Sequence, residues 1–500
     1  MPNIIAYLAL FSWPVVAILL FRLLPLQKAL VWTIIGGYLL LPSATSIKLP
    51  MLPPIDKSVV ATLPALILCL LMAPPQPPIQ AAMARIGRNV LLALLMIVII
   101  SPVLTVLQNS EPVIDGRIHL PGLRLYDAMS LISYLLVSLI PLWLGLRYLN
   151  SREGLRTILE VLAIGGLAYT IPVLFEVRFS PQLHNWIYGF FPHSFVQHVR
   201  EDGFRPVVFL QHGLLVGIYL CIAAIASVTL YREARREGRP ALYWLMGAIW
   251  LLVVLFLSKN FGAMMIAGVL TAATFLLGRR PLLVIGLVVS AVVMFYPILR
   301  GAGWIPVDSV LEFVRSINLE RAASLKFRFD NEDALLARAS EKPLLGWGSW
   351  GRDLLHDPAT GRLVSIIDGI WVGVIGSFGW IGYIGRFGLL TSPILFFALR
   401  RRAMGDSFLP FGLIITLSAT LIDLLPNSGL VNYVWLMAGA VAGHALWWQD
   451  PGTEGSAADE RAAQSGARPF AAPARAAWLM SDTGPTATRG PRGHGTRSRR

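Results

Sequence analysis

The longest polar segment of this chain reads SVLEFVRSINLERAASLKFRFDNEDALLARASEKPLLGWGSWG, from Ser309 to Gly351. It interrupts a sequence that is otherwise built of apolar runs. Its apolar residues recur every three or four positions until Lys342-Pro343, a spacing typical of amphipathic helices that lie on a surface. We therefore predict two or three such helices between residues 309 and 340. They would belong to a polar segment, residues 300–365, that is longer than a simple connection needs.

The composition outside this segment is that of a membrane protein. Hydrophobic residues make up 55% of the 500 residues, charged residues 14%, and the mean hydropathy is +0.64. Many apolar runs are about 18–22 residues long, enough to cross a bilayer. Only helices and closed barrels satisfy the backbone in lipid, and the runs do not alternate as barrel strands do. The sequence predicts an all-α, polytopic transmembrane helical bundle of about 12–13 spans. These are residues 3–21, 29–41, 59–73, 90–107, 128–148, 158–175, 207–231, 241–257, 262–277, 282–299, 366–399, 408–425 and 432–448.

The loops between these runs differ in charge. Basic residues gather in one set of alternate loops, near positions 22–28, 85–88, 147–156, 232–239, 279–280 and 400–402. The positive-inside rule places these loops in the cytoplasm, and the N-terminus and the 300–365 segment outside. The net charge of +14 is explained by this pattern without a nucleic-acid partner. In a bacterial inner membrane, the outside is the periplasm.

The chain divides into four parts by composition. Residues 1–299 hold the first transmembrane helices and an external loop at 176–206, and residues 300–365 form the large periplasmic loop. Residues 366–449 hold the last transmembrane helices. Residues 450–500 are rich in Ala, Gly, Pro, Ser, Thr and Arg, and we predict a disordered cytoplasmic tail, either solvated or bound to anionic lipid.

The 176–206 loop mixes aromatic residues with histidines. The aromatics could anchor the chain at the membrane interface or stack on sugars. The histidines lack carboxylates or cysteines at ligand spacing, so we predict no metal. Cys69 and Cys221 lie in apolar runs, where they are expected to be buried free thiols.

Several short motifs follow one another in the second half of the chain. Ser324-x3-Arg328 precedes Lys342-Pro-Leu-Leu-Gly-Trp-Gly348, then Asp368, then Gly376-x2-Gly379-x2-Gly382. We expect the long run at 366–399 to bend near Gly379. This order resembles the signature region of the O-antigen polymerase and O-antigen ligase superfamily, whose members are polytopic bacterial glycosyltransferases.

The resemblance implies a GT-C-like membrane fold and a metal-independent, inverting glycosyltransferase without a cofactor. Such an enzyme transfers a glycan from a polyprenyl-pyrophosphate carrier to an acceptor hydroxyl during assembly of O-antigen, capsule or exopolysaccharide in the cell envelope. Its expected partners are that carrier-linked glycan, a polysaccharide or lipid-linked acceptor, membrane lipids, and chain-length regulator or export proteins. The resemblance covers roughly the seventh to eleventh spans.

The resemblance also implies roles for two arginines. Arg205, at the mouth of the seventh span, would bind the pyrophosphate of the donor, and Arg328 would be the second essential arginine. A guanidinium stays charged and bonds phosphate with two donors. The alternatives are that Arg205 pairs with a lipid phosphate and that Arg328 pairs with Asp330, Glu332 or Asp333.

Four further residues are candidate substrate contacts. Gln211 and His212 are expected one to two turns into the seventh span, where polar groups usually face a cavity. Lys259 could add charge at the turn where relatives carry arginine and this chain has Phe261. Ser324 shares a helix face with Arg328.

The general base is predicted to be Asp368 or a loop histidine. Ligases of this superfamily place a His-Asn pair before the Gly-x2-Gly span, whereas here Asp368-Gly369 stands there and the nearest histidine is His356. A positioned carboxylate can accept the proton of an acceptor hydroxyl. Asp368 could instead cap the following helix. The competing interpretations of the whole chain are a multi-pass transporter or flippase, and a non-catalytic scaffold of a polysaccharide export system.

Overall fold

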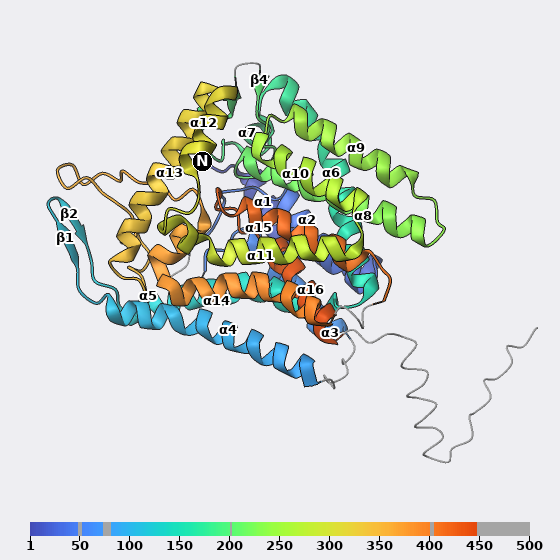
Figure 1. Cartoon of the computed structure of the whole chain (residues 1–500), viewed down its shortest axis with the longest axis horizontal. Helices are drawn as coiled ribbons and strands as arrows, with labels where there is room; N and C mark the ends of the chain where they lie inside the picture. Colours follow the sequence, from blue (N-terminus) through green and yellow to red (C-terminus); the bar gives the residue numbers. More distant parts are fainter. Residues whose placement is uncertain (49–52, 74–81, 201–202, 401–404, 448–500) are drawn as a thin grey trace, which may run out of the picture. The chain divides into compact units, whose positions relative to one another are not determined.

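The chain is almost entirely helical, as the computed structural model shows (Figure 1). The structure describes residues 1–48, 53–73, 82–200, 203–400 and 405–447. The predicted disordered tail lies outside these residues. Strands are limited to two short hairpins in the described part, β1 (Val113–Asp115) with β2 (Ile118–Leu120) and β3 (Val199–Arg200) with β4 (Gly203–Phe204).

Seven helices of the described residues are long and apolar enough to cross a membrane, which supports the prediction of a helical membrane protein. They are α1 (Ile4–Leu23), α4 (Ala82–Gln108), α5 (Leu125–Tyr148), α6 (Arg152–Phe179), α8 (Gly213–Arg236), α11 (Arg279–Gly301) and α14 (Ile370–Arg400).

Six shorter helices fall on the other predicted spans. They are α2 (Leu26–Leu40), α3 (Lys57–Met72), α9 (Leu242–Leu257), α10 (Phe261–Leu276), α15 (Leu409–Asp423) and α16 (Asn432–Trp447). Each has only 15 or 16 residues, whereas a span needs about 17–25. A count of 12–13 spans therefore stays a prediction.

The seventh predicted span, 207–231, begins too early. Helix α8 starts at Gly213, and the residues before it are irregular. The buried carboxylate of Glu176 accepts hydrogen bonds from the N–H groups of Val207 and Val208, both 2.7 Å away. Val208 has a φ of +52°, which is strained for a β-branched residue. Apolar length alone could not locate the start of α8, because residues 207–210 are as apolar as the helix that follows. Their irregular backbone is fixed by the side chain of Glu176 on α6.

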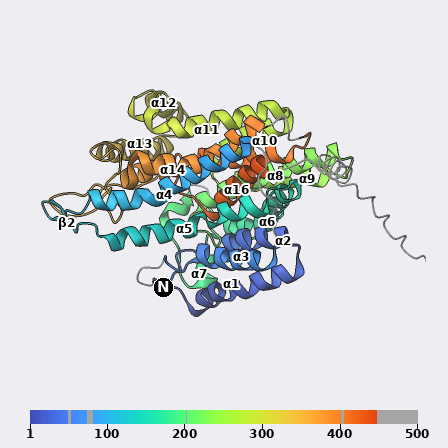
Figure 2. The same ribbon diagram turned by 90° about the horizontal axis from the view of Figure 1, so that it is seen from below.

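The helices run roughly parallel or antiparallel to one another, so the loops between them gather in two groups, one at each end of the helices. Figure 2 shows α1, α2 and α3 on one side, α4, α5, α14 and α16 in the middle and α11 on the other side. One group of loops contains residues 109–124, 180–200, 203–212, 302–369 and 424–431. They are joined by contacts such as Arg117 N–H to Pro358 O (2.9 Å) and Ile370 N–H to Asn427 O (3.2 Å). We name this the loop end.

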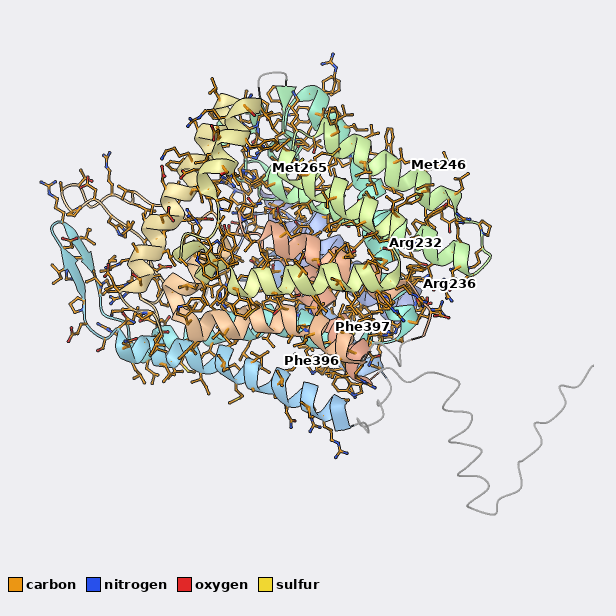
Figure 3. The ribbon with its side chains drawn as sticks, viewed as in Figure 1. Arg232, Arg236, Met246, Met265, Phe396 and Phe397 are labelled. Carbon is orange, nitrogen blue, oxygen red and sulfur yellow. The ribbon has the colours of Figure 1, made fainter. Side chains whose placement is uncertain are left out.

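The opposite group of loops is rich in arginine, and we name it the basic end. Glu233, near the end of α8, accepts hydrogen bonds from Arg152, Arg236 and the N–H of Phe408. Arg279 pairs with Asp406. Figure 3 labels Arg232 and Arg236 here, on the far side of the view from α12 and α13.

The 300–365 segment contains the two predicted amphipathic helices. They are α12 (Val307–Ile317) and α13 (Leu319–Ser340), joined at Asn318. α12 has no buried residue, whereas α13 packs against both α12 and α14. The helices end just before Lys342-Pro343, as the spacing predicted.

The predicted bend in α14 is also present. Gly379 has φ 62° and ψ −167° inside an otherwise continuous helix. A bend breaks helical hydrogen bonds, and the segment 343–348 replaces them. Pro343 O and Leu344 O accept from the N–H groups of Trp380 (2.8 Å) and Ile381 (3.2 Å).

The same segment also supplies donors to the other side of the bend. The N–H groups of Trp347 and Gly348 donate to Gly376 O (2.8 Å) and Ser377 O (2.9 Å). A Cβ at Gly379 would lie 2.3 Å from the Leu344 carbonyl, so no larger residue fits. The two glycine-rich motifs of the sequence therefore form one clasp, and their first role is structural.

Candidate functional site

Arg205 lies against Gly213, the first residue of α8, at the loop end, and Arg328 interacts electrostatically with His212, the N-cap of the same helix. The side chain of Arg205 covers Gly213 so closely that a Cβ there would meet its Cγ at 2.5 Å. Arg328, on α13, and Arg205 are both close enough to His212 to lower its pKa. The fold thus brings together three of the predicted site residues from distant parts of the chain.

Three histidine rings gather beside these arginines. The centroid of His212 lies 4.9 Å from that of His193 and 4.6 Å from that of His198. His198 is fully buried, and its Nδ1 and Nε2 contact Ser194 O (2.9 Å) and the N–H of Gly213 (3.3 Å). Burial lowers the pKa of His198 to about 4 and that of His212 to about 3, so both rings are neutral at pH 7.

These neutral rings act as hydrogen-bonding groups. Nδ1 of His212 accepts from the N–H of Leu214 (3.0 Å), which places the ring proton on Nε2 as a donor. With both nitrogens of His198 and one of His212 engaged, too few lone pairs remain for a cation. Among the described residues, no group of three His, Cys, Asp or Glu side chains could hold a metal ion.

Arg328 is held by neutral oxygens. Its Nη1 donates to Pro426 O (3.1 Å) and to Asn427 Oδ1 (3.3 Å), and the Asn427 amide donates to Asp423 (2.8 Å). The alternative of a surface pair with a neighbouring carboxylate is wrong. Asp330 pairs with Lys326.

The other two neighbouring carboxylates turn to Arg300 instead. Asp333 lies 2.8 Å and Glu332 3.8 Å from the guanidinium of Arg300, a buried residue at the end of α11. Both contacts draw these carboxylates away from Arg328. The charge of Arg328 acts instead on the carboxyl groups of Asp368 and Asp423, without an ion pair to either in the described part of the chain.

Two carboxyl groups near Arg328 have raised pKa values. Burial raises the pKa of Asp368, and the charge of Arg328 opposes this shift. Burial raises the pKa of Glu332 to about 7, opposed by Arg300 and by the Trp371 indole. A raised pKa makes each carboxylate a stronger proton acceptor, and Glu332 can exchange a proton near neutral pH, as a general base must. The sequence pattern named Asp368, whereas Glu332 was grouped with surface charges, because its burial depends on α11 and α14.

Of the other predicted substrate contacts, only some lie near Arg205 and Arg328. The Nζ of Lys259 lies 3.4 Å from where a Cβ on Gly203 would be, beside the hairpin that leads to Arg205. Ser324 is exposed on α13, one turn before Arg328. Gln211 is exposed, and both Gln211 and His212 precede helix α8, so the prediction that they lie inside a span is wrong. His212 is instead the N-cap of α8.

Arg352 shows why charge and loop position do not identify a site. It is 2% exposed, and it donates to Trp347 O, Pro121 O and Glu111 O at 2.8–3.2 Å. This arginine joins the 109–124 loop to the 343–353 segment and has a structural role. A search for arginines in polar loops cannot distinguish it from Arg328.

The comparisons with known proteins give no family. No protein-family model matches the chain, and no curated protein sequence is significantly similar to it. The resemblance to the O-antigen polymerase and ligase superfamily therefore stays a prediction, carried by the motif order and by the geometry of these residues.

Proposed function

We propose that this chain is a glycan polymerase or ligase that transfers a glycan from a polyprenyl-pyrophosphate carrier to an acceptor hydroxyl. The observation that carries the proposal is that Arg205 packs on Gly213 at the N-terminus of α8, while Arg205 and Arg328 both interact electrostatically with His212. Two guanidinium groups and the positive end of a helix dipole suit a diphosphate. The active site would face the periplasm of the inner membrane, in line with the basic residues at the opposite end.

In the proposed reaction, the acceptor oxygen attacks the anomeric carbon while the bond to the carrier diphosphate breaks. Arg205 and Arg328 stabilise the charge that develops on the leaving diphosphate. His212 adds a neutral N–H donor from Nε2. A carboxylate removes the hydroxyl proton, and Asp368, which is close to Arg328, is the proposed base. Glu332 lies one turn along α13 from Arg328 and is a second candidate for this step.

The test is substitution of the two arginines. Arg328→Ala and Arg205→Ala should each lower the rate of glycan transfer roughly 10²–10³-fold, the usual cost of losing a transition-state donor. Lysine should restore little at either position, because it lacks the two-pronged donor geometry. Transfer is measured with purified protein and a polyprenyl-pyrophosphate-linked glycan, and as polymer or ligated product in cells lacking the native gene.

Arg362 is the matched control, because it is an exposed arginine of the same polar segment. Arg362→Ala should transfer at the normal rate. Full transfer by Arg328→Ala at normal protein level would defeat the proposal and favour transport or scaffolding. Equal loss at Arg362 would mean that the segment needs only its net charge.

A further inference from the structure

A cavity lies between α4, α5, α14 and α16, and an arginine lines it. Its volume, counted as the space open to the centre of a water-sized group, is about 70 Å³, and it opens to the surface on one side. Figure 2 shows α4 running between α14 and α5, and it contacts both. The polar side chains of the lining are Arg386 of α14 with Tyr134 and Ser138 of α5. The remaining lining residues are Val98, Leu135, Leu139, Ile370, Leu430 and Trp435.

The charge of Arg386 has no carboxylate to balance it. Within the described residues, its guanidinium makes no ion pair and no hydrogen bond. It lies 4.8 Å from the ring centroid of Phe378 and interacts electrostatically with Tyr134. Arg386 also lies well inside α14, about 10 Å along the helix from the bend at Gly379. A charge at such a position is costly and usually serves a function.

The outer part of the cavity is accessible from the surface of the helices. Tyr134 is 55% exposed, so the cavity opens on the side of α5 that carries this ring. In a membrane protein such a face meets lipid chains. The inner part reaches Ile370 and Leu430, which flank the loops that carry Asp368 and Asn427.

We propose that this cavity binds the phosphate headgroup of a lipid, with Arg386 as the phosphate-binding residue. The guanidinium supplies paired donors, the hydroxyl groups of Tyr134 and Ser138 supply two more polar contacts, and the apolar walls receive the first part of the lipid chain. The site is separate from Arg205 and Arg328. The proposal does not require that the protein transfer glycans, because it concerns binding alone.

The test uses the full-length protein in detergent and farnesyl diphosphate as the probe. Arg386→Gln should weaken its binding about tenfold or more, the loss expected for a charge-assisted contact worth about 1.5–3 kcal/mol. Arg315→Gln, which removes an exposed arginine of α12, should bind as the unaltered protein does. Inorganic pyrophosphate should bind more weakly than farnesyl diphosphate, because it has no chain to bury.

A photoreactive farnesyl diphosphate locates the bound probe and separates this cavity from the site at Arg205 and Arg328. Cross-links are expected on α5 near Tyr134 and on α16 near Trp435. Cross-links confined to other helices would overturn the proposal, as would unchanged binding by Arg386→Gln. Equal affinity for pyrophosphate would also overturn it, since the site would then bind free phosphate rather than lipid. Competition by phosphatidylglycerol would support a general lipid-phosphate site.

A second variant covers the case in which Arg386→Gln does not fold. Ser138→Leu keeps the charge and fills part of the cavity, so it should also weaken probe binding and lose the cross-links near Tyr134. Binding by Ser138→Leu equal to that of the unaltered protein, with the same cross-links, would contradict a site in this cavity.

Discussion

The two ends of the helices use arginine in opposite ways. At the basic end, Arg152 and Arg236 bond the buried carboxylate of Glu233, which ties α6, α8 and the start of α15 together. At the loop end, Arg328 bonds a carbonyl and an amide oxygen, and His212 beside it is neutral. Compensated charge fixes the fold, whereas charge held by neutral groups remains available for an anionic ligand.

The largest effect is expected from removing the Glu233 carboxylate at the basic end. Glu233→Ala leaves two arginines and a backbone N–H without their acceptor, so we expect a loss of about 3–5 kcal/mol in the free energy of unfolding. Thermal unfolding in detergent measures it.

The control for this change is Glu237→Ala at the same end. The side chain of Glu237 is 21% exposed, against 1% for Glu233, so its loss should cost no more than about 1 kcal/mol. Equal losses would mean that burial does not set the strength of these pairs.

A smaller loss is expected for Arg352, a structural arginine at the loop end. Arg352→Ala removes the donor to three carbonyl groups and should cost about 2–3 kcal/mol of stability. Arg362→Ala, on an exposed side chain of the same segment, should stay within about 0.5 kcal/mol. Equal unfolding temperatures for the two variants would show that Arg352 does not stabilise the contact between the 109–124 loop and the 343–353 segment.

The neutral histidines predict a dependence on pH. The folded pKa of His198 is about 4, below the ordinary value of 6.5, so only the unfolded chain binds its proton between these values. Stability should therefore fall as pH decreases from about 6.5 toward 4. His198→Gln should reduce this fall by about 1–2 kcal/mol, measured as unfolding at pH 6.5 and at pH 5.

His119→Gln serves as the control for the pH experiment, because His119 lies exposed on β2. It should leave the slope unchanged. A slope in His198→Gln identical to that of the unaltered protein would show that the buried ring is protonated in the folded state.

The smallest effect is expected from disturbing the contact between Arg205 and Gly213. Gly213→Ala should displace the Arg205 side chain and slow glycan transfer about tenfold without unfolding the protein. Gly268→Ala on α10, where a new Cβ would meet nothing within 4 Å, should transfer normally. Normal transfer by Gly213→Ala would remove Arg205 from the proposed site.

Much of this fold could be predicted from local patterns. Apolar length located a helix for each predicted span, three-and-four spacing located α12 and α13, and Phe378-Gly379-Trp380 located the bend. The start of α8 was missed, because Glu176 on another helix determines it.

The candidate site was predictable only in part, for the same reason. Arg205 and Arg328 followed from a motif, whereas the burial of Glu332 and the bonds of Arg352 depend on residues distant in sequence. Arg386 had a local signal that was overlooked, since it is a lone charge in the middle of an apolar run.

The clasp at Gly379 has a consequence for the order in which the chain is assembled. The part of α14 after the bend, up to Arg400, is roughly 31 Å long at 1.5 Å per residue, which is enough to enter the bilayer as a complete span. The part before the bend depends on the preceding loop, because Gly376 O and Ser377 O accept hydrogen bonds from residues 347 and 348. We therefore expect the second half of α14 to be inserted during synthesis, and the first half to settle afterwards, once the preceding loop has crossed the membrane and folded. Asp368 and Trp371 would then reach their final positions at the last stage of assembly.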